Sequence, residues 1–115
     1  MIKLITAQDR KRLLSNAARK SAQPDFDPFP VVKLQTLFLP CVWLLTELDP
    51  RDPDMAYGLC DLGMGCPEIG SVYLPELAAL KRGPMAVVER DPFFKADKTL
   101  TAYAAEARAA GRILI

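Results

Sequence analysis

Apolar side chains recur at helical spacing in the first twenty residues. Leu13 and Ala17 lie four residues apart, and each is followed by a second apolar residue, so these side chains fall on one face of an α-helix. Thr6 stands three residues before Asp9, which is the arrangement of a capping box at a helix N-terminus. The pattern predicts a helix over residues 7–20.

Four apolar runs follow at hairpin-like intervals and predict β-strands. Before them, the prolines between residues 23 and 30 predict an extended connector, because proline fixes its own φ and disfavours helix in the residue before it. Turns that contain proline, glycine and aspartate separate the runs, which is typical of an antiparallel meander. The four predicted strands cover residues 31–38, 41–48, 55–62 and 68–74.

The last third of the chain predicts two helices and one more strand. Pro75 and Gly83 bracket a short helix, since proline suits the first helical turn and glycine the position after the last. Residues 85–90 are the fifth predicted strand. From residue 98 onward, apolar residues at helical spacing predict a helix that Gly111 ends.

Together these elements predict an α+β protein that forms a single domain over residues 1–115. Its centre is a curled antiparallel five-stranded sheet or a small β-barrel, with an N-terminal helix, a short helix before the last strand and a C-terminal helix. The predicted organisation is a helix within residues 1–22, a connector at 23–30, and the sheet with the other helices at 31–115. A chain of 115 residues buries a sizeable core without disulfides or metals.

The apolar runs also bear on where the protein works. The run LFLPCVWLL is too short to cross a bilayer, and charged residues interrupt any signal-peptide pattern at the start of the chain. We therefore expect a cytoplasmic protein with no membrane partner.

Composition restricts the chemistry that the chain can perform. Histidine is absent, which excludes histidine triads, histidine-ligated metals and imidazole acid-base pairs. The three cysteines lack paired C-x-x-C spacing, so they indicate neither a disulfide framework nor a zinc knuckle. The glycines around the turn GMGCP do not match a nucleotide-binding loop. We predict no metal and no cofactor.

Charge is segregated along the chain, although the formal net charge is only +1. Residues 1–20 carry six basic side chains and one acid, about +5 by counting, whereas residues 25–76 carry nine acids and two bases, about −7. The favoured interpretation is that two surfaces of one domain attract each other weakly through solvent. The alternative is a basic helix offered to an acidic partner such as nucleic acid, against which the near-neutral pI counts.

Acidic residues near the predicted strand ends suggest two separate rims of the sheet. Glu47 and Asp61 end neighbouring antiparallel strands, roughly 20 Å apart at about 3.3 Å per residue, so they cannot form one acid-base dyad. Glu47 belongs to a rim with the acids of DPRDPD, and Asp61 to a rim with Glu68 across the GMGCP turn. The second pair either binds a divalent cation loosely, shares a proton, or accepts hydrogen bonds from the turn's backbone, which is the favoured interpretation.

Arg90 is the most prominent basic residue of the predicted sheet. Strand alternation sends it to the opposite face from Glu89. A partly buried arginine needs a carboxylate partner, and we expect Glu47 or Glu68 to supply it. The pair is either a structural ion pair, which we favour, or a site where Arg90 stabilises a phosphate or an oxyanion.

Trp43 and Tyr57 fall on adjacent predicted strands. We interpret both as packing aromatics, with stacking on a base or on a partner's side chain as the alternative.

Several strings of this chain resemble a bacterial family called domain of unknown function 2958. They are DPFPVVKL, WLLTELDP, GLCDLGMGCPEIG, LPELAAL, ERDPFFK and KTLTAYAAEARAAGRI, which occur in this order over nearly the whole chain. The chain departs from the family at QTLFLPCV, where members more often have a polar turn that contains glycine. The resemblance implies a protein carried by mobile genetic elements such as plasmids and phages, and it implies no catalytic residues.

The expected function is that of a binding module acting on a protein or nucleic-acid partner. The candidate binding surface consists of Trp43, Glu47, Tyr57, Asp61, Glu68, Glu89 and Arg90. The alternative is a metal-independent endoribonuclease-like protein, similar in outline to the barrel toxins of toxin-antitoxin pairs, that uses Glu89 and Arg90 with Glu47 or Glu68. The charge balance counts against this alternative, because nucleic-acid binding depends on phosphate neutralisation.

Overall fold

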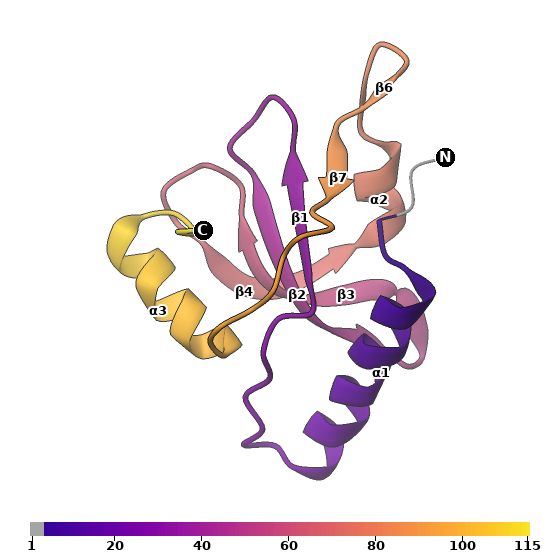
Figure 1. Ribbon diagram of the computed structural model, residues 1–115, viewed down its shortest axis with the longest axis vertical. Coiled ribbons are helices and arrows are strands. Elements are labelled where there is room, and N and C mark those ends of the chain that lie inside the picture. The colour runs from indigo at the N-terminus through magenta and orange to yellow at the C-terminus, as the bar shows by residue number, and fades with distance from the viewer. Residues whose placement is uncertain (1–3) are drawn as a thin grey trace.

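The computed structural model describes residues 4–115 (Figure 1). Helix α1 (Ala7–Ala22) begins with the predicted capping box. The Asp9 backbone N–H donates to Thr6 Oγ1 at 3.0 Å, and the Thr6 backbone N–H donates to Asp9 Oδ2 at 2.9 Å. These bonds satisfy backbone donors that have no partner within the helix. The helix ends two residues later than predicted, and residues 1–3 of the predicted N-terminal region lie outside the described residues.

Five strands form the predicted antiparallel sheet. Their order across the sheet is β4, β3, β2, β1, β7, so the first four are the expected meander and β7 returns to pair with β1. Because β4 and β7 are free edges, the sheet is open and does not close into a barrel. The bounds are β1 (Val32–Thr36), β2 (Val42–Asp49), β3 (Asp52–Asp61), β4 (Glu68–Tyr73) and β7 (Val88–Arg90).

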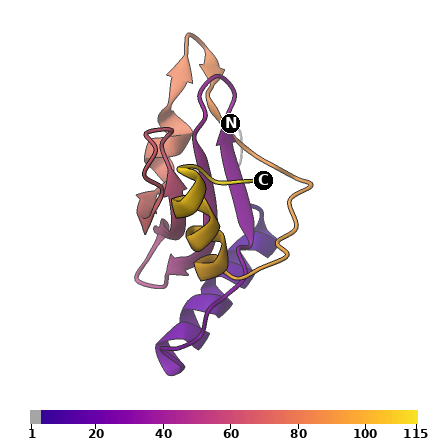
Figure 2. The ribbon, with the colours of Figure 1, turned by 90° about the vertical axis from the view of Figure 1, so that its left-hand side faces the viewer.

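Helices cover both faces of the sheet. On one face, Leu13 of α1 and Leu45 of β2 belong to a core that also includes helix α2 (Leu74–Ala79). On the other face, Leu44 packs under helix α3 (Leu100–Ala110), which lies in front of the strands in Figure 2. Successive residues of β2 therefore point into two different cores, as the period of a strand requires.

A β-bulge interrupts β2 at Thr46. The pairing with β3 shifts register between Leu45 and Glu47, which leaves Thr46 as the extra residue. The buried Thr46 hydroxyl donates to the carbonyl of Tyr57 at 3.3 Å, and the Asn16 side chain of α1 donates to the Thr46 carbonyl at 2.9 Å. The bulge is thus bonded both to the next strand and to the helix above it.

A hairpin replaces parts of the predicted short helix and fifth strand. Helix α2 ends at Ala79, earlier than expected, and β5 (Lys81–Arg82) pairs with β6 (Met85–Ala86). Gly83 was expected to follow the helix directly, but it lies in the hairpin turn with φ of 61°. Proline at the next position cannot donate a backbone hydrogen bond, so Gly-Pro favours this turn. The predicted strand at 85–90 is divided into β6 and β7.

Helix α3 begins and ends close to its predicted bounds. The Thr99 side chain caps it by accepting from the Ala102 backbone N–H at 3.4 Å, and Gly111 ends it with φ of 78°. Asp27 of the proline connector accepts hydrogen bonds from the side chain and the backbone of Thr101. Within residues 4–115, no helix combines the length and the apolar character needed to span a membrane.

Candidate binding surfaces

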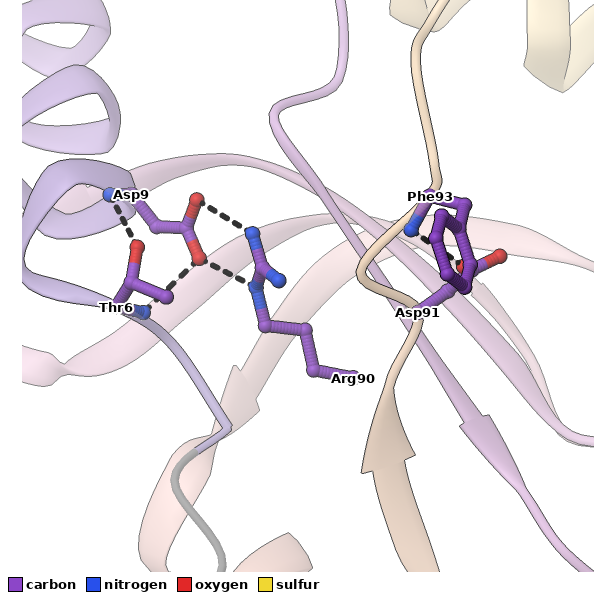
Figure 3. A network of polar contacts seen from close by, with 5 residues as sticks. All are labelled: Thr6, Asp9, Arg90, Asp91 and Phe93. Carbon is purple, nitrogen blue, oxygen red and sulfur yellow. Dashed lines mark hydrogen bonds and ion pairs between the residues drawn. The ribbon is translucent and has the colours of Figure 1, made fainter.

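Arg90 forms a bidentate ion pair with Asp9 at the start of α1 (Figure 3). Arg90 Nε donates to Asp9 Oδ2 at 2.6 Å, and Arg90 Nη2 donates to Asp9 Oδ1 at 3.1 Å. The prediction that Glu47 or Glu68 pairs with Arg90 is therefore wrong. The reason is that α1 folds over the sheet and brings its first turn to β7, a contact that the spacing of residues along the strands does not reveal.

The ion pair is structural because Asp9 serves two elements at once. Its side chain is only 5% exposed, and it binds both Arg90 and the backbone N–H of Thr6. Burial alone would raise the pKa of Asp9, but the hydrogen bonds from Arg90 and Thr6 and the charge of the guanidinium lower it below its usual value. The hydrogen bond to Asp9 in turn raises the pKa of Arg90. The pair therefore ties the last strand of the sheet to the first helix.

Asp61 is buried and holds the turn after β3 together with the C-terminal segment. The backbone N–H of Gly63 donates to its Oδ1 at 2.8 Å, and the backbone N–H of Ile113 donates to Oδ2 at 2.9 Å. The first of these bonds confirms, for Asp61, the favoured prediction that the carboxylates accept hydrogen bonds from the backbone of the turn. Glu68 is exposed and pairs with Cys60 on the neighbouring strand, so these two side chains share a face of the sheet. Asp61 is the next residue after Cys60 and therefore points to the opposite face from Glu68. The two carboxylates do not share a site.

Glu47 borders a hollow at the opposite end of the sheet from Asp61, as predicted. Glu47, Tyr57 and Ser71 face one another across three neighbouring strands, and Lys20 of α1 also lines the hollow, which has a volume of about 360 Å³. Burial raises the pKa of Glu47, although a hydrogen bond from Thr46 and the positive charge of Lys20 act in the other direction. The attraction between Lys20 and Glu47 fits the favoured interpretation of the charge segregation.

Two other residues of the predicted surface serve the fold. Trp43 is only 3% exposed and belongs to the core that also contains Leu13 of α1 and Leu74 of α2, which leaves its ring no access to a base or partner. Glu89 accepts a hydrogen bond from the Gln35 side chain of the neighbouring strand at 3.4 Å. Tyr57, at 39% exposed, is the more accessible aromatic of the predicted pair. The seven predicted residues are thus dispersed over both faces and both ends of the sheet.

An apolar groove lies between the start of α1, helix α2 and the β5–β6 hairpin. Its volume is about 1350 Å³. Alanines and larger aliphatic side chains form most of its lining. The main apolar lining residues are Leu4, Ile5, Leu74, Ala78, Ala86 and Val88.

Charged side chains are few in this groove and mostly basic. Arg10 and Lys81 line it together with one acid, Asp54. Arg10 is held by a hydrogen bond of 3.5 Å from its Nη1 to the carbonyl of Pro53. Small-molecule pockets typically occupy about 300–1,000 Å³, so this groove has room for a larger occupant such as a polypeptide segment.

Sequence reasoning did not identify the groove. One signal was present: the string LPELAAL places Ala78 and Ala79 beside the buried Leu77, which makes the short helix apolar on more than its core-facing side. The other wall, at Leu4 and Ile5, lies about seventy residues away in the chain, and only the tertiary fold joins the two. In the part of the chain that the structure describes, no group of three or more cysteines and carboxylates is placed to hold a metal ion.

Comparison with known proteins identifies a family. The model of a family described as "Protein of unknown function (DUF2958)" matches residues 4–114. Searches of curated proteins and of solved structures gave no significant match. The family match spans nearly the whole chain and confirms the resemblance seen in its sequence. The chain belongs to the DUF2958 family.

Proposed function

We propose that this protein is a binding module for another protein, and that the groove beside α2 receives an apolar segment of the partner with at least one acidic side chain. The observation that supports the proposal is the groove itself, which is mainly apolar, has a volume of about 1350 Å³ and is lined by two basic side chains. Binding sites of this kind combine apolar walls with a few charged groups that orient the ligand.

The chemistry of the partner follows from the lining of the groove. Its aliphatic walls favour leucine-like side chains, since burying apolar surface gives most of the affinity in such grooves. Lys81 is exposed and Arg10 is half-buried, and together they outnumber Asp54. A carboxylate on the partner would therefore be attracted, whereas a second basic group would be repelled.

This proposal moves the binding surface away from the acidic rim expected from the sequence. The family resemblance adds a setting to the proposal, namely an accessory protein carried by a mobile genetic element and working in the cytoplasm. The endoribonuclease alternative gains no support from the geometry, because its arginine, Arg90, is engaged through two nitrogens by Asp9.

Selection from a random peptide library displayed on phage tests the proposal. Wild-type protein should enrich peptides that combine apolar residues with Asp or Glu. The variant Ala79→Glu, which fills the groove from α2 and places an acid beside the acid of the enriched peptides, should bind them at least about tenfold more weakly. The matched control Ala105→Glu, on the exposed face of α3, should bind as wild type does. Equal binding by both variants would exclude the groove.

A further inference from the structure

Three loops at one end of the sheet expose most of the large apolar side chains found on the surface. The loops are residues 37–41 between β1 and β2, 62–67 between β3 and β4, and 80–87 around the β5–β6 hairpin, and we refer to them as the three-loop surface. The first and the last extend beyond the sheet at the top of Figure 1. Among residues 4–115, seven of the twelve exposed large hydrophobic side chains lie here: Leu37, Phe38, Leu39, Leu62, Met64, Leu80 and Met85.

Direct contacts join these loops into one surface. The Arg82 guanidinium carbon lies 4.9 Å from the centre of the Phe38 ring, which is a cation–π contact between the hairpin and the first loop. The Leu37 backbone N–H donates to the carbonyl of Val87 at 3.0 Å. Gly63 of the remaining loop lies so close to Pro40 that a β-carbon on it would come within 2.8 Å of the proline ring. The apolar side chains therefore form a shared patch.

The charges of the three-loop surface have a single sign. Residues 37–41, 62–67 and 80–87 contain Lys81 and Arg82 but no aspartate or glutamate. This contrasts with the acidic hairpin between β2 and β3 at the other end of the sheet, which carries Asp49, Asp52 and Asp54. Exposed Glu68 directly follows the 62–67 loop, and the acidic hairpin also carries Arg51, so the contrast holds between the loops and not between whole ends of the molecule.

The exposed apolar side chains and the positive charge of the three-loop surface indicate which kind of partner it fits. Phe38, Leu39 and Met64 lie within the connecting loops, outside the strands, so they can enter a soft apolar layer that lies beneath an anionic surface. The interface of an anionic bilayer has this structure, since phosphate headgroups attract lysine and arginine while apolar side chains reach the acyl boundary. The apolar run LFLPCVWLL, too short to span a bilayer, is divided between an exposed loop tip and the buried strand β2.

We propose that the three-loop surface docks peripherally on anionic lipid bilayers, with Phe38 and its apolar neighbours inserted and Lys81 and Arg82 against the headgroups. The three-loop surface shares Lys81, Pro84 and Ala86 with the groove, but the groove lining includes neither Phe38 nor Arg82, so substitutions at these two residues test the docking alone. It revises the expectation of no membrane partner, which rested on the length of the apolar runs and so addressed only membrane-spanning segments.

Sedimentation with lipid vesicles tests this proposal. The wild-type chain should bind vesicles of phosphatidylcholine and phosphatidylglycerol, bind pure phosphatidylcholine vesicles weakly, and lose binding as salt rises. Phe38→Ser should lower the vesicle partition coefficient about tenfold through lost apolar burial. Arg82→Glu should lower it by at least about tenfold on anionic vesicles through charge reversal.

Matched controls separate docking from general effects of the substitutions. Phe93→Ser removes an aromatic ring that is 91% exposed on a different loop, and Arg12→Glu reverses an exposed charge on α1; both variants should bind as wild type does. Equal melting temperatures by circular dichroism exclude misfolding as the cause of lost binding. The proposal is overturned if wild type ignores anionic vesicles, or if the controls lose as much binding as the loop variants. It is also overturned if light scattering shows a wild-type dimer that Phe38→Ser makes monomeric, because the surface would then join two copies of this chain.

Discussion

At the scale of single residues, Asp9 joins two ends of the chain that lie 81 positions apart in sequence. It completes the capping box of α1 and holds Arg90 of β7 with both of its oxygens. One carboxylate therefore supports both a helix start and an edge strand. This double role explains why a residue outside the sheet is as buried as the residues of the core.

Replacing Asp9 by alanine should destabilise the fold by about 2–4 kcal/mol. The substitution removes a capping bond and leaves Arg90 without its partner, and the partial exposure of Arg90 keeps the cost near the lower end of the range for buried pairs. Urea unfolding of Asp9→Ala, Arg90→Ala and the double variant should give a coupling free energy of about 1 kcal/mol or more. Asp25→Ala, at an exposed position, is the control and should stay within about 0.5 kcal/mol of wild type. Additive effects at the two sites would contradict the ion pair.

The contribution of Asp9 to the free energy of unfolding should also disappear at acidic pH. Its pKa in the folded protein is lowered from the ordinary value of 3.8, so the stabilisation is complete above that value and is lost as pH falls through the folded pKa. The stability difference between wild type and Asp9→Ala should therefore narrow as unfolding is measured below about pH 4.

Glu47 should behave in the opposite way. Burial raises its folded pKa above the ordinary value of 4.5, so its effect is favourable at low pH and is lost as pH rises through the folded pKa. Glu47→Gln should be more stable than wild type at pH 7, by less than about 1 kcal/mol, and the gain should vanish below about pH 4. Urea unfolding across this pH range measures the difference. A less stable Gln variant at pH 7 would show that the attraction of Lys20 outweighs the cost of burial.

At the scale of elements, the close approach of β2 and β3 beside the bulge requires glycine at position 58. A β-carbon there would lie 2.0 Å from the carbonyl oxygen of Leu44, and the obstacle is backbone, which cannot rotate away. Gly58→Ala should therefore destabilise the protein by at least about 3 kcal/mol.

The chain provides a matched control for this substitution. Gly70 pairs with Gly58 across β3 and β4, and a β-carbon at Gly70 would meet no atom within 4 Å. Gly70→Ala should change stability by less than about 1 kcal/mol, with a small gain expected because alanine loses less backbone entropy on folding. Thermal unfolding followed by circular dichroism compares the two variants. Similar melting temperatures would contradict the packing of β2 against β3.

At the scale of the whole molecule, local patterns predicted the elements but not their distant contacts. The meander and the start of α1 were predictable because strand period, turn residues and the Thr6–Asp9 capping box are signals within a few residues. The hairpin at Gly83 was missed because glycine after a helix suits both a cap and a turn, and the following residues decide between them.

The candidate sites depended even more on tertiary structure. Trp43 lies buried on a strand, which confirms its favoured interpretation as a packing aromatic. Arg90, in contrast, has its partner in helix α1, far from it in the sequence. The groove requires Leu4 and Ala78 to meet across the fold, and no local pattern contains both.

The central functional claim is that the groove beside α2 is the site of protein binding. The most direct test is a titration of the isotope-labelled chain with the peptide selected on phage, followed by nuclear magnetic resonance of backbone amides and methyl groups. The proposal predicts shift changes over residues 4–10, 74–79 and 81–86, with slower dissociation of the peptide from wild type than from the Ala79→Glu variant. Changes confined to the hollow around Glu47, Tyr57 and Ser71, with the groove signals unmoved, would contradict it.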